Sequence, residues 1–401
     1  MTQTRREFIR SSAALGLLTA FVGAPARAGG QVQMPIGVGT HTNGGPLVVY
    51  MQEHGLIEAA SEAAGIDVMP EFQDFQALLR MLQGVAAGQL HYGMLGSTPA
   101  IRLLATPNPA VPIAIAGGGL DFPVQVPADS PIRNMDDVRG KTVLTIVGSD
   151  LHLQWANMLK AHFGTSDAAE VGITMRNITA VTELWEVHDG IDAVVGLNPG
   201  SFGAEERGVL STLMTNYGTT GKHYDGPEGQ GAGHTLDWFK NAAFAPEAFY
   251  PHRIWWAVRQ QFMDEHPEAV TAFLVANQQA ASALSQMSPT DVTNIIGDHW
   301  PQSASVEARN AVVDATTWYR RGWSWITEGD AGTLSGLSEE KEIFETALSG
   351  KMIAEILGRG ADVTRAAYEQ VGQQPAMDVM TDKDAGDVRG LPQWRVADWQ
   401  L

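Results

Sequence analysis

The sequence predicts an α/β protein made of two similar lobes, and three observations lead to this prediction. First, short apolar segments of strand length alternate with segments of helical periodicity from Val32 onward. Second, the alternation occurs twice, on either side of a stretch rich in Gly and Pro over residues 117–131. Third, residues 88–99 parallel residues 190–199, since each has a glycine, a short strand, a small or polar residue and a proline in that order. Strands that alternate with helices favour largely parallel sheets covered on both faces.

In the first unit, apolar runs predict four strands, over residues 34–38, 66–72, 90–95 and 111–116. Apolar residues at helical spacing predict three helices between them, over residues 47–54, 75–87 and 98–105. Gly55 and Gly88 are expected to end the first two of these helices, because glycine adopts the backbone conformation that closes a helix.

The second unit repeats this order. Its predicted strands span residues 142–147, 173–178 and 191–195, and its predicted helices span residues 135–138, 151–163 and 181–188. A further strand is expected at residues 254–258, and a long helix at 264–283 with Pro267 near its start, where the missing N–H matters least. Beyond that helix we expect mostly helical structure to residue 371 and a polar, irregular tail.

The amino terminus has the pattern of an export signal. Arg5 and Arg6 precede an apolar run over residues 13–22, and residues 26–28 form a small-x-small cleavage pattern. The run is too short to cross the roughly 30 Å hydrocarbon core of a membrane. Paired arginines before such a run are the twin-arginine address. We therefore expect a signal peptide over residues 1–28 and export to the periplasm, with no lipid anchor because no cysteine follows the run.

The composition argues against several classes of partner and several kinds of reactive site. The formal net charge is −19 and becomes −22 without residues 1–28, and such an acidic surface argues against nucleic acid and anionic membranes as partners. The absence of cysteine excludes disulfides, thiolate metal sites and a cysteine nucleophile. No H-E-x-x-H, G-x-S-x-G or Walker-type motif occurs, and the spacing of His223, His234 and His252 fits no metal site. We expect no catalytic residue, no metal and no cofactor.

Candidate ligand-binding residues follow the predicted strands. In open α/β sheets, ligands bind beyond the carboxyl ends of the strands, beside helix amino termini that attract anions. Small polar residues and glycines occupy these positions, and the candidates are Thr42, Asn43, Gly44, Ser97, Thr98, Gly148, Ser149, His152, Asn198 and Trp255. For Asn43, Ser97, Thr98 and Ser149 the alternative is helix capping, their commonest role. For His152 the alternative is exposure to solvent.

Aromatic side chains are the second feature that a cleft would need. The candidates for its walls are Phe122, Trp155, Trp185, Tyr217, Trp255 and Trp256. Core packing is the favoured role for most of them, and only one of Trp255 and Trp256 can face a given side of their strand. The adjacent pairs Asp136-Asp137 and Glu205-Glu206 do not face each other on a helix, so a solvated surface is the better interpretation for both.

Several segments taken in order resemble the periplasmic solute-binding proteins of nitrate, sulfonate, taurine and thiamine-precursor ABC importers. They are residues 88–99, 140–143, 148–152, 190–194 and 264–268, within a similarity that covers about residues 32–283. Two departures are His91, where the family usually has an acidic residue, and the helical region beyond Ser285, which is longer than usual.

The resemblance implies a two-lobed periplasmic-binding-protein fold, with two doubly wound α/β lobes and a helical C-terminal extension. We expect the first lobe to span residues 32–120 and 234–300, the second lobe residues 121–223, and the extension and tail residues 301–401. The resemblance also implies a monomer that captures a small organic anion, such as an organosulfonate or a related acid, and docks in its closed form on an ABC permease. One alternative is an enzyme on the same fold that acts on a thiamine-pyrimidine-type or porphyrin-precursor substrate. Another is a ligand sensor that docks on a membrane receptor.

Overall fold

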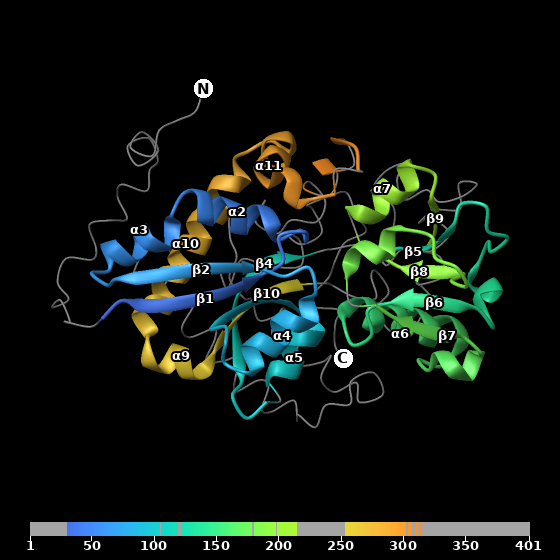
Figure 1. The fold of residues 1–401 in the computed structure, drawn as a ribbon, viewed down its shortest axis with the longest axis horizontal. Coiled ribbons are helices and arrows are strands. Elements are labelled where there is room, and N and C mark those ends of the chain that lie inside the picture. The colour runs from blue at the N-terminus through green and yellow to red at the C-terminus, as the bar shows by residue number, and fades with distance from the viewer. Residues whose placement is uncertain are drawn as a thin grey trace.

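The computed structural model describes residues 30–104, 106–118, 122–178, 180–197, 199–214, 253–301, 304–306, 309–310 and 313. Figure 1 shows two α/β lobes side by side, each built on one sheet of five strands. We call them lobe 1, which holds the first strands and the segment from residue 253, and lobe 2, which holds residues 124–214. The predicted two-lobed α/β fold is thus observed. The predicted boundaries at residues 120/121, 223 and 234 fall outside the described residues and stay predictions.

The sheet of lobe 1 has the strand order β2-β1-β3-β10-β4. These strands span Val68–Asp74, Val32–Val38, Tyr92–Gly96, Arg253–Arg259 and Ala110–Gly118 respectively. Strand β1 pairs in parallel with both β2 and β3, whereas β10 lies antiparallel between β3 and β4. Four strands therefore run in one direction and β10 runs in the other.

The sheet of lobe 2 has the order β7-β6-β8-β5-β9. These strands span Thr174–Asn177, Thr142–Thr145, Ala193–Val195, Val124–Pro127 and Leu210–Met214. Strand β6 pairs in parallel with β7 and β8, and β5 lies antiparallel between β8 and β9. The topology of lobe 1 is thus repeated, with β5 in the place of β10.

Each antiparallel strand is the first described strand after the chain changes lobe. Strand β5 follows the crossing from β4, and β10 is the first described strand after β9. The parallel strands of both lobes end at the boundary between the lobes, so a chain that enters there must run away from it. This explains why sheets that are otherwise parallel, as predicted, each contain one reversed strand.

Helices cover both faces of each sheet (Figure 1). Those of lobe 1 are α2 (Gly45–Glu53), α3 (Leu56–Ala63), α4 (Leu78–Ala86), α5 (Ser97–Leu104), α9 (Gln260–Glu265), α10 (Pro267–Ser285) and α11 (Pro289–Ile296). Lobe 2 has α6 (Asp150–Phe163) and α7 (Gly200–Glu206). Short 3-10 helices span Met135–Val138, Ala168–Val171, Val181–Trp185 and Gly297–His299.

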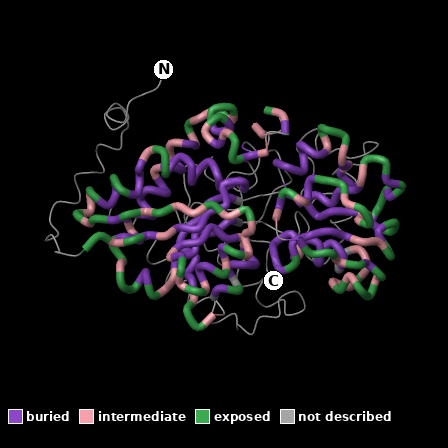
Figure 2. The backbone as a smooth tube through the Cα atoms, in the orientation of Figure 1, coloured by how far each residue is buried: buried purple, intermediate pink, exposed green. Residues whose placement is uncertain are grey.

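The two adjacent tryptophans of β10 pack on opposite faces of the sheet, as their strand geometry predicts. Trp255 joins the core that contains α4 and α5 and continues into lobe 2, and Trp256 joins the core under α2, α3 and α10. Both are fully buried, and Figure 2 shows the buried backbone concentrated along the sheets of both lobes. Trp256 donates its indole N–H to Oδ1 of Asn277 on α10, so this buried N–H group has a hydrogen-bond partner.

Four sequence predictions need correction. Gly55 ends α2 as expected, but its φ of 55° lets a second helix, α3, start immediately after it. Residues 123–131 were expected to form only a crossover, yet they contain β5, whose polar Gln125 is buried and donates to the carbonyl of Ser201. The helix predicted over 181–188 is a 3-10 helix that ends at Trp185. The long helix starts at Pro267, after the short helix α9, rather than at residue 264.

The predicted likeness between residues 88–99 and 190–199 is visible in the structure. Gly88 and Gly190 both have positive φ, of 78° and 73°, and each precedes the middle strand of its sheet, β3 or β8. That strand is central in both sheets, and a helix follows it. The predicted C-terminal extension over residues 301–401 lies almost wholly outside the described residues. Among the helices that the structure describes, none combines the length and apolarity needed to span a membrane.

The loop after β1 contains a buried histidine, His41, whose protonation affects the stability of the protein. His41 is 2% exposed, and neither ring nitrogen has a hydrogen-bond partner among the described residues. Burial lowers the pKa of His41 to about 4, although the nearby Asp74 carboxylate acts in the opposite direction. Asp74 in turn accepts hydrogen bonds from the backbone N–H and hydroxyl of Thr40. The loop is therefore built around a neutral imidazole.

His41 should make the protein less stable in acid. The unfolded chain protonates this side chain below a pH of about 6.5 and the folded chain only near pH 4, so the unfolded state binds more protons between these values. The free energy of unfolding should fall as pH falls through this window, with a contribution from His41 on the order of 3 kcal/mol. Urea unfolding of wild type and His41→Gln at several pH values measures it. The two profiles should run parallel from pH 7 to 8, and identical losses from pH 6.5 to 4 would contradict the assignment.

Candidate functional site

A pocket lies between the two lobes. Its volume is about 50 Å³. Lobe 1 contributes Thr42, Leu78, Leu79, Met94, Leu95, Gly96, Pro99 and Ile254, and the segment from Phe122 to Leu197 contributes Phe122, Ile146, Ser149, Asp150, Leu151 and Leu197. Most of the lining is apolar. Among the described residues that line it, Asp150 alone is ionisable.

The pocket sits where the parallel strands of both sheets end. Thr42 follows β1, Gly96 is the last residue of β3, Ile146 follows β6 and Leu197 follows β8. Helices begin at the same edge, since α5 starts at Ser97 and α6 starts at Asp150. The position is therefore the one that ligands occupy in open α/β sheets.

A hydrogen bond joins the lobes across this pocket. The backbone N–H of Thr98, in the first turn of α5, donates to Oδ1 of Asp150, in the first turn of α6, at 2.8 Å. The side chain of Asp150 is deeply buried, with 5% exposure of the residue. A carboxylate at a helix amino terminus is stabilised by the unpaired N–H groups and the positive end of the helix dipole.

Gly96 leaves the space that this carboxylate occupies. A β-carbon on Gly96 would overlap Oδ2 of Asp150, and the nearest atoms that it would meet all belong to the Asp150 side chain. Residue 96 is thus small for a local steric reason, because the carboxylate of lobe 2 lies against its α-carbon. Thr98 carries a further polar group here: its Oγ1 is buried and has no hydrogen-bond partner among the described residues.

Three candidates, Thr42, Asn43 and Gly44, lie in the loop between β1 and α2. Thr42 lines the pocket, its hydroxyl donates to the carbonyl of Gly39, and its own carbonyl accepts the indole N–H of Trp300. Asn43 is fully buried, with Oδ1 beside the α-carbon of Gly117 at the end of β4. Gly44 is the N-cap of α2. The loop therefore supports the pocket wall, and Thr42 is its residue at the lining.

Ser97, Thr98 and Trp255 form one buried group beside the pocket. Trp255 donates its indole N–H to the Ser97 hydroxyl at 3.0 Å, and both side chains are fully buried. This bond ties the start of α5 to the antiparallel strand β10. Thr98 meets Asp150 through its backbone N–H.

Gly148, Ser149 and His152 form the turn between β6 and α6. Ser149 lines the pocket and donates its hydroxyl to the carbonyl of Ile146 at 2.6 Å. The backbone N–H of Gly148 donates to Nδ1 of His152, so this imidazole is neutral with its proton on Nε2. Burial, and secondarily the charge of Arg102, lower the pKa of His152. His152 is thus half-buried and holds the turn.

Arg102 reaches from α5 toward the same turn. Its side chain is exposed, and a β-carbon on Gly148 would stand 2.6 Å from one guanidinium nitrogen, so the guanidinium lies directly over this glycine. The turn of lobe 2 is therefore covered by a cation of lobe 1. Asn198, the remaining polar candidate, lies outside the described residues.

Most of the aromatic candidates are in the core, as favoured from the sequence. Trp155 is buried in the core of lobe 2, and a β-carbon on Gly200 would overlap the ring of Trp185. Phe122 is the candidate that lines the pocket. Tyr217 lies outside the described residues.

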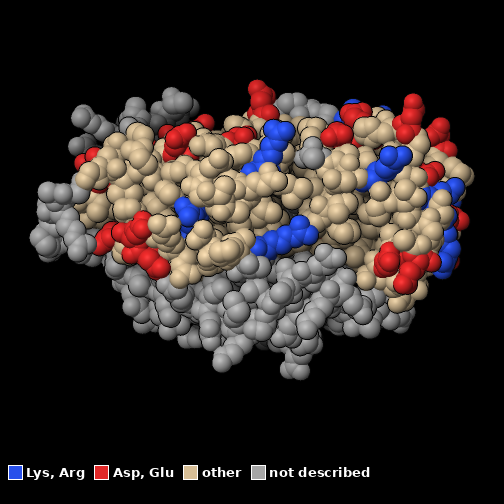
Figure 3. Space-filling view, turned by 60° about the horizontal axis from the view of Figure 1, so that its bottom comes forward, with Lys and Arg blue, Asp and Glu red and all other residues tan. Residues whose placement is uncertain are grey.

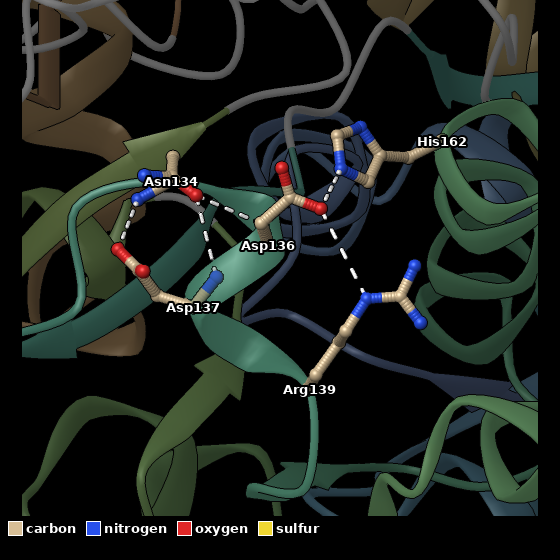
Figure 4. Close-up of polar contacts among 5 residues, drawn as sticks. All are labelled: Asn134, Asp136, Asp137, Arg139 and His162. Carbon is tan, nitrogen blue, oxygen red and sulfur yellow. Dashed lines mark hydrogen bonds and ion pairs between the residues drawn. The ribbon is translucent and has the colours of Figure 1, made fainter.

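The carboxylates of Asp136 and Asp137 have local structural roles (Figure 4). Asn134 and Asp137 form a reciprocal capping box at the start of the 3-10 helix Met135–Val138. The exposed Asp136 lies 3.1 Å from Nε2 of His162 and 4.0 Å from Nε of Arg139. The pair is therefore not arranged for acid–base catalysis.

The described residues contain no group of His, Asp and Glu side chains arranged to hold a metal ion. His223, His234 and His252 lie outside the described residues. On the face shown in Figure 3, acidic side chains are spread over both lobes, while basic side chains lie near the middle and toward the end of lobe 2.

The contacts of Asp150 and Glu206 were not predicted from the sequence. An acidic residue in the first turn of a helix fits a simple dipole effect, so nothing in the local pattern of Asp150 pointed to Thr98, 52 residues away. Glu206, expected only to be solvated, accepts hydrogen bonds from the backbone N–H and hydroxyl of Ser305 at 2.7 and 2.6 Å.

Comparison with known proteins shows the family to which the chain belongs. Residues 62–291, more than half of the chain, match the family model described as NMT1/THI5 like. No curated protein matches the chain.

Solved structures show the same fold. The alkanesulfonate-binding protein SsuA from Xanthomonas axonopodis pv. citri bound to MOPS is 13% identical over 84% of this chain and 99% of its own, with a TM-score of 0.58. The periplasmic nitrate-binding protein NrtA from Synechocystis PCC 6803 is 12% identical over 90% and 91%, with a TM-score of 0.57. The aliphatic sulphonate binding protein SsuA from Escherichia coli is 14% identical over 82% and 92%, with a TM-score of 0.54. The chain therefore has the two-lobed periplasmic-binding-protein fold and belongs to the NMT1/THI5-like family.

Proposed function

We propose that the chain is the solute-binding component of an ABC importer, and that it captures a small organic acid between its two lobes. One observation carries this proposal: the pocket is lined from both lobes at the carboxyl ends of the parallel strands. A ligand held there contacts both lobes only when they are closed, so its binding energy favours the closed form. The closed form is then the species that a membrane permease recognises.

The helix starts around the pocket support an acidic ligand. Helices α5 and α6 begin at the cleft, and their first-turn N–H groups and dipoles favour a negative group without a fixed cation. The apolar lining from Leu78, Leu79, Phe122 and their neighbours suits an organic body behind that group. The SsuA and NrtA structures are of proteins named for sulfonate and nitrate binding, which agrees with an oxyanion or an organosulfonate-like acid.

The proposed cellular location follows from the amino-terminal sequence and the family. The Arg5-Arg6 signal would send the protein by the twin-arginine route to the periplasm, where it would act as an unanchored monomer. Binding is proposed rather than catalysis because the structures named above are of binding proteins and the sequence lacks the cysteines expected of the enzymes considered.

The ligand class can be tested by a thermal-shift screen of the exported protein. We expect MOPS, short alkanesulfonates, carboxylates or nitrate to raise the unfolding temperature, because a ligand that binds only the folded state stabilises it in proportion to its occupancy. Sugars and organic cations at the same concentrations and ionic strength serve as controls. Stabilisation by the controls alone would contradict the acid assignment.

Ser149→Ala should weaken the binding of the best acid from the screen. Ser149 lines the pocket and its hydroxyl can also accept a hydrogen bond, and the loss of one hydrogen-bonding group lowers affinity by roughly two- to tenfold. Titration calorimetry measures the change. Ser285→Ala is the matched control, because its hydroxyl also donates to the carbonyl three residues earlier but lies at the end of α10. Equal affinity of both variants and wild type would remove Ser149 from the site.

Replacing Arg5 and Arg6 together with lysine should leave the precursor inside the cell. Lysine keeps the positive charge, so only a receptor that reads the arginine pair distinguishes the two sequences. Immunoblots of periplasmic and cytoplasmic fractions measure the distribution. Normal export of the double variant would overturn the twin-arginine assignment, and a Lys substitution at Arg10 alone controls for a general effect of the change.

A further inference from the structure

The pocket already contains a carboxylate that belongs to the protein. Asp150 lines the pocket, is 5% exposed and accepts the Thr98 N–H at 2.8 Å. That N–H belongs to the first turn of α5, one of the helix starts at which the acid group of a ligand would bind. The carboxylate of lobe 2 therefore occupies an anion position of lobe 1.

The local shape is fitted to this occupant. Gly96 ends β3, and a β-carbon there would overlap Oδ2 of Asp150. The φ of Gly96 lies outside the left-handed region, so its backbone does not require glycine. The contact with Asp150 is thus the observed reason for a missing side chain at this position.

A second carboxylate of lobe 2 makes the same kind of contact. Glu206, at the end of α7, accepts hydrogen bonds from both the backbone N–H and the hydroxyl of Ser305, which follows α11 in the chain. Asp150 is buried and Glu206 is exposed, so the two contacts lie in the interior and at the surface respectively. Both connect lobe 2 to segments that belong with lobe 1.

We propose that Asp150 is a built-in occupant of the α5 amino terminus, which holds the unliganded protein closed and competes with the acid group of the ligand. The first half of this proposal concerns closure alone. The second half rests on the proposed function. A bound acid would displace the carboxylate from the Thr98 N–H, and the energy of the Asp150 contact would be subtracted from the observed affinity.

Closure without ligand can be measured by the distance between labels on the two lobes. The chain has no cysteine, so Glu58→Cys on α3 and Glu170→Cys in lobe 2 introduce two unique and exposed attachment sites. Asp150→Ala should raise the ratio of open to closed molecules about tenfold, as expected for the loss of a hydrogen bond to a charged group. Asp189→Ala, an exposed carboxylate of the same lobe, should leave the ratio unchanged. An unchanged ratio in Asp150→Ala would overturn the closure.

Gly96→Ala tests the same contact while Asp150 stays in place. The new methyl group should push the carboxylate away from α5 and open the lobes to a similar extent. In the Asp150→Ala background the methyl group has no carboxylate to displace, so it should add no further opening. Independent, additive opening by the two substitutions would show that Gly96 and Asp150 do not act through one contact. Circular dichroism of each variant verifies that it is folded.

Titration with MOPS tests the competition. Asp150→Ala should bind MOPS about tenfold more tightly than wild type, because its α5 amino terminus is vacant and no buried negative charge repels the ligand. Weaker or equal binding would overturn the competition. If neither protein binds MOPS or any other acid of the screen, the proposed ligand class is wrong and so is the proposed competition. The distances between the labels then still test whether Asp150 keeps the lobes closed.

Discussion

Within the described residues the chain passes from lobe 1 to lobe 2 after β4 and is back in lobe 1 at β10, and this constraint determines the rest of the architecture. Each crossing is followed by a strand that enters the other sheet at the lobe boundary and lies antiparallel between two of its strands. Strand β5 lies between β8 and β9, which come later in the chain, and β10 lies between β3 and β4, which come earlier. Lobe 1 is therefore built from two separate segments of the chain, whereas the strands of lobe 2 lie in one segment. The carboxyl ends of the parallel strands all face the boundary as a result, and this brings helix starts from both lobes to one pocket.

The chemistry of the pocket follows from which groups meet there. Residues at helix starts and small hydroxyl residues lie beside apolar side chains, and no described cationic side chain lines the pocket. Such groups suit a negative ligand group in an apolar surrounding. The charge that is fixed at the pocket is negative, and a helix start of the opposite lobe neutralises it. The same geometry thus serves an interaction between the lobes and, under the proposed function, one with a ligand. The proposal makes selectivity depend on how well a ligand replaces the contact between Asp150 and the Thr98 N–H.

Local sequence pattern predicted most strands and helices, and long-range pairing accounts for what it missed. Strand β1 from Met34 onward, strand β3 and the centre of β6 are apolar runs, and Gly88, with its positive φ, follows the end of α4 as predicted. Gly190 was predicted to end a helix in the same way, but it lies five residues after the 3-10 helix Val181–Trp185. Strand β5 was not predicted, because one proline precedes it, another is its last residue, and its Gln125 is polar. The buried Gln125 side chain is explained by the hydrogen bond that it donates to the carbonyl of Ser201. The site followed the same rule. Thr42 and Ser149 could be identified by their positions after strands, whereas the role of Asp150 depends on a partner that no local pattern reveals.

The insertion of β10 also has a consequence for how the chain acquires its structure. The described strands of lobe 2 come from one continuous segment, residues 124–214, so the five-stranded sheet of this lobe can form as soon as that segment is made. Lobe 1 must wait for residues 253–259, because until then β3 and β4 lack the strand that joins them. Its sheet therefore depends on contacts between distant parts of the chain, which are slow to form. During that interval two unpaired strand edges are exposed, and these are the surfaces most prone to pair with another chain.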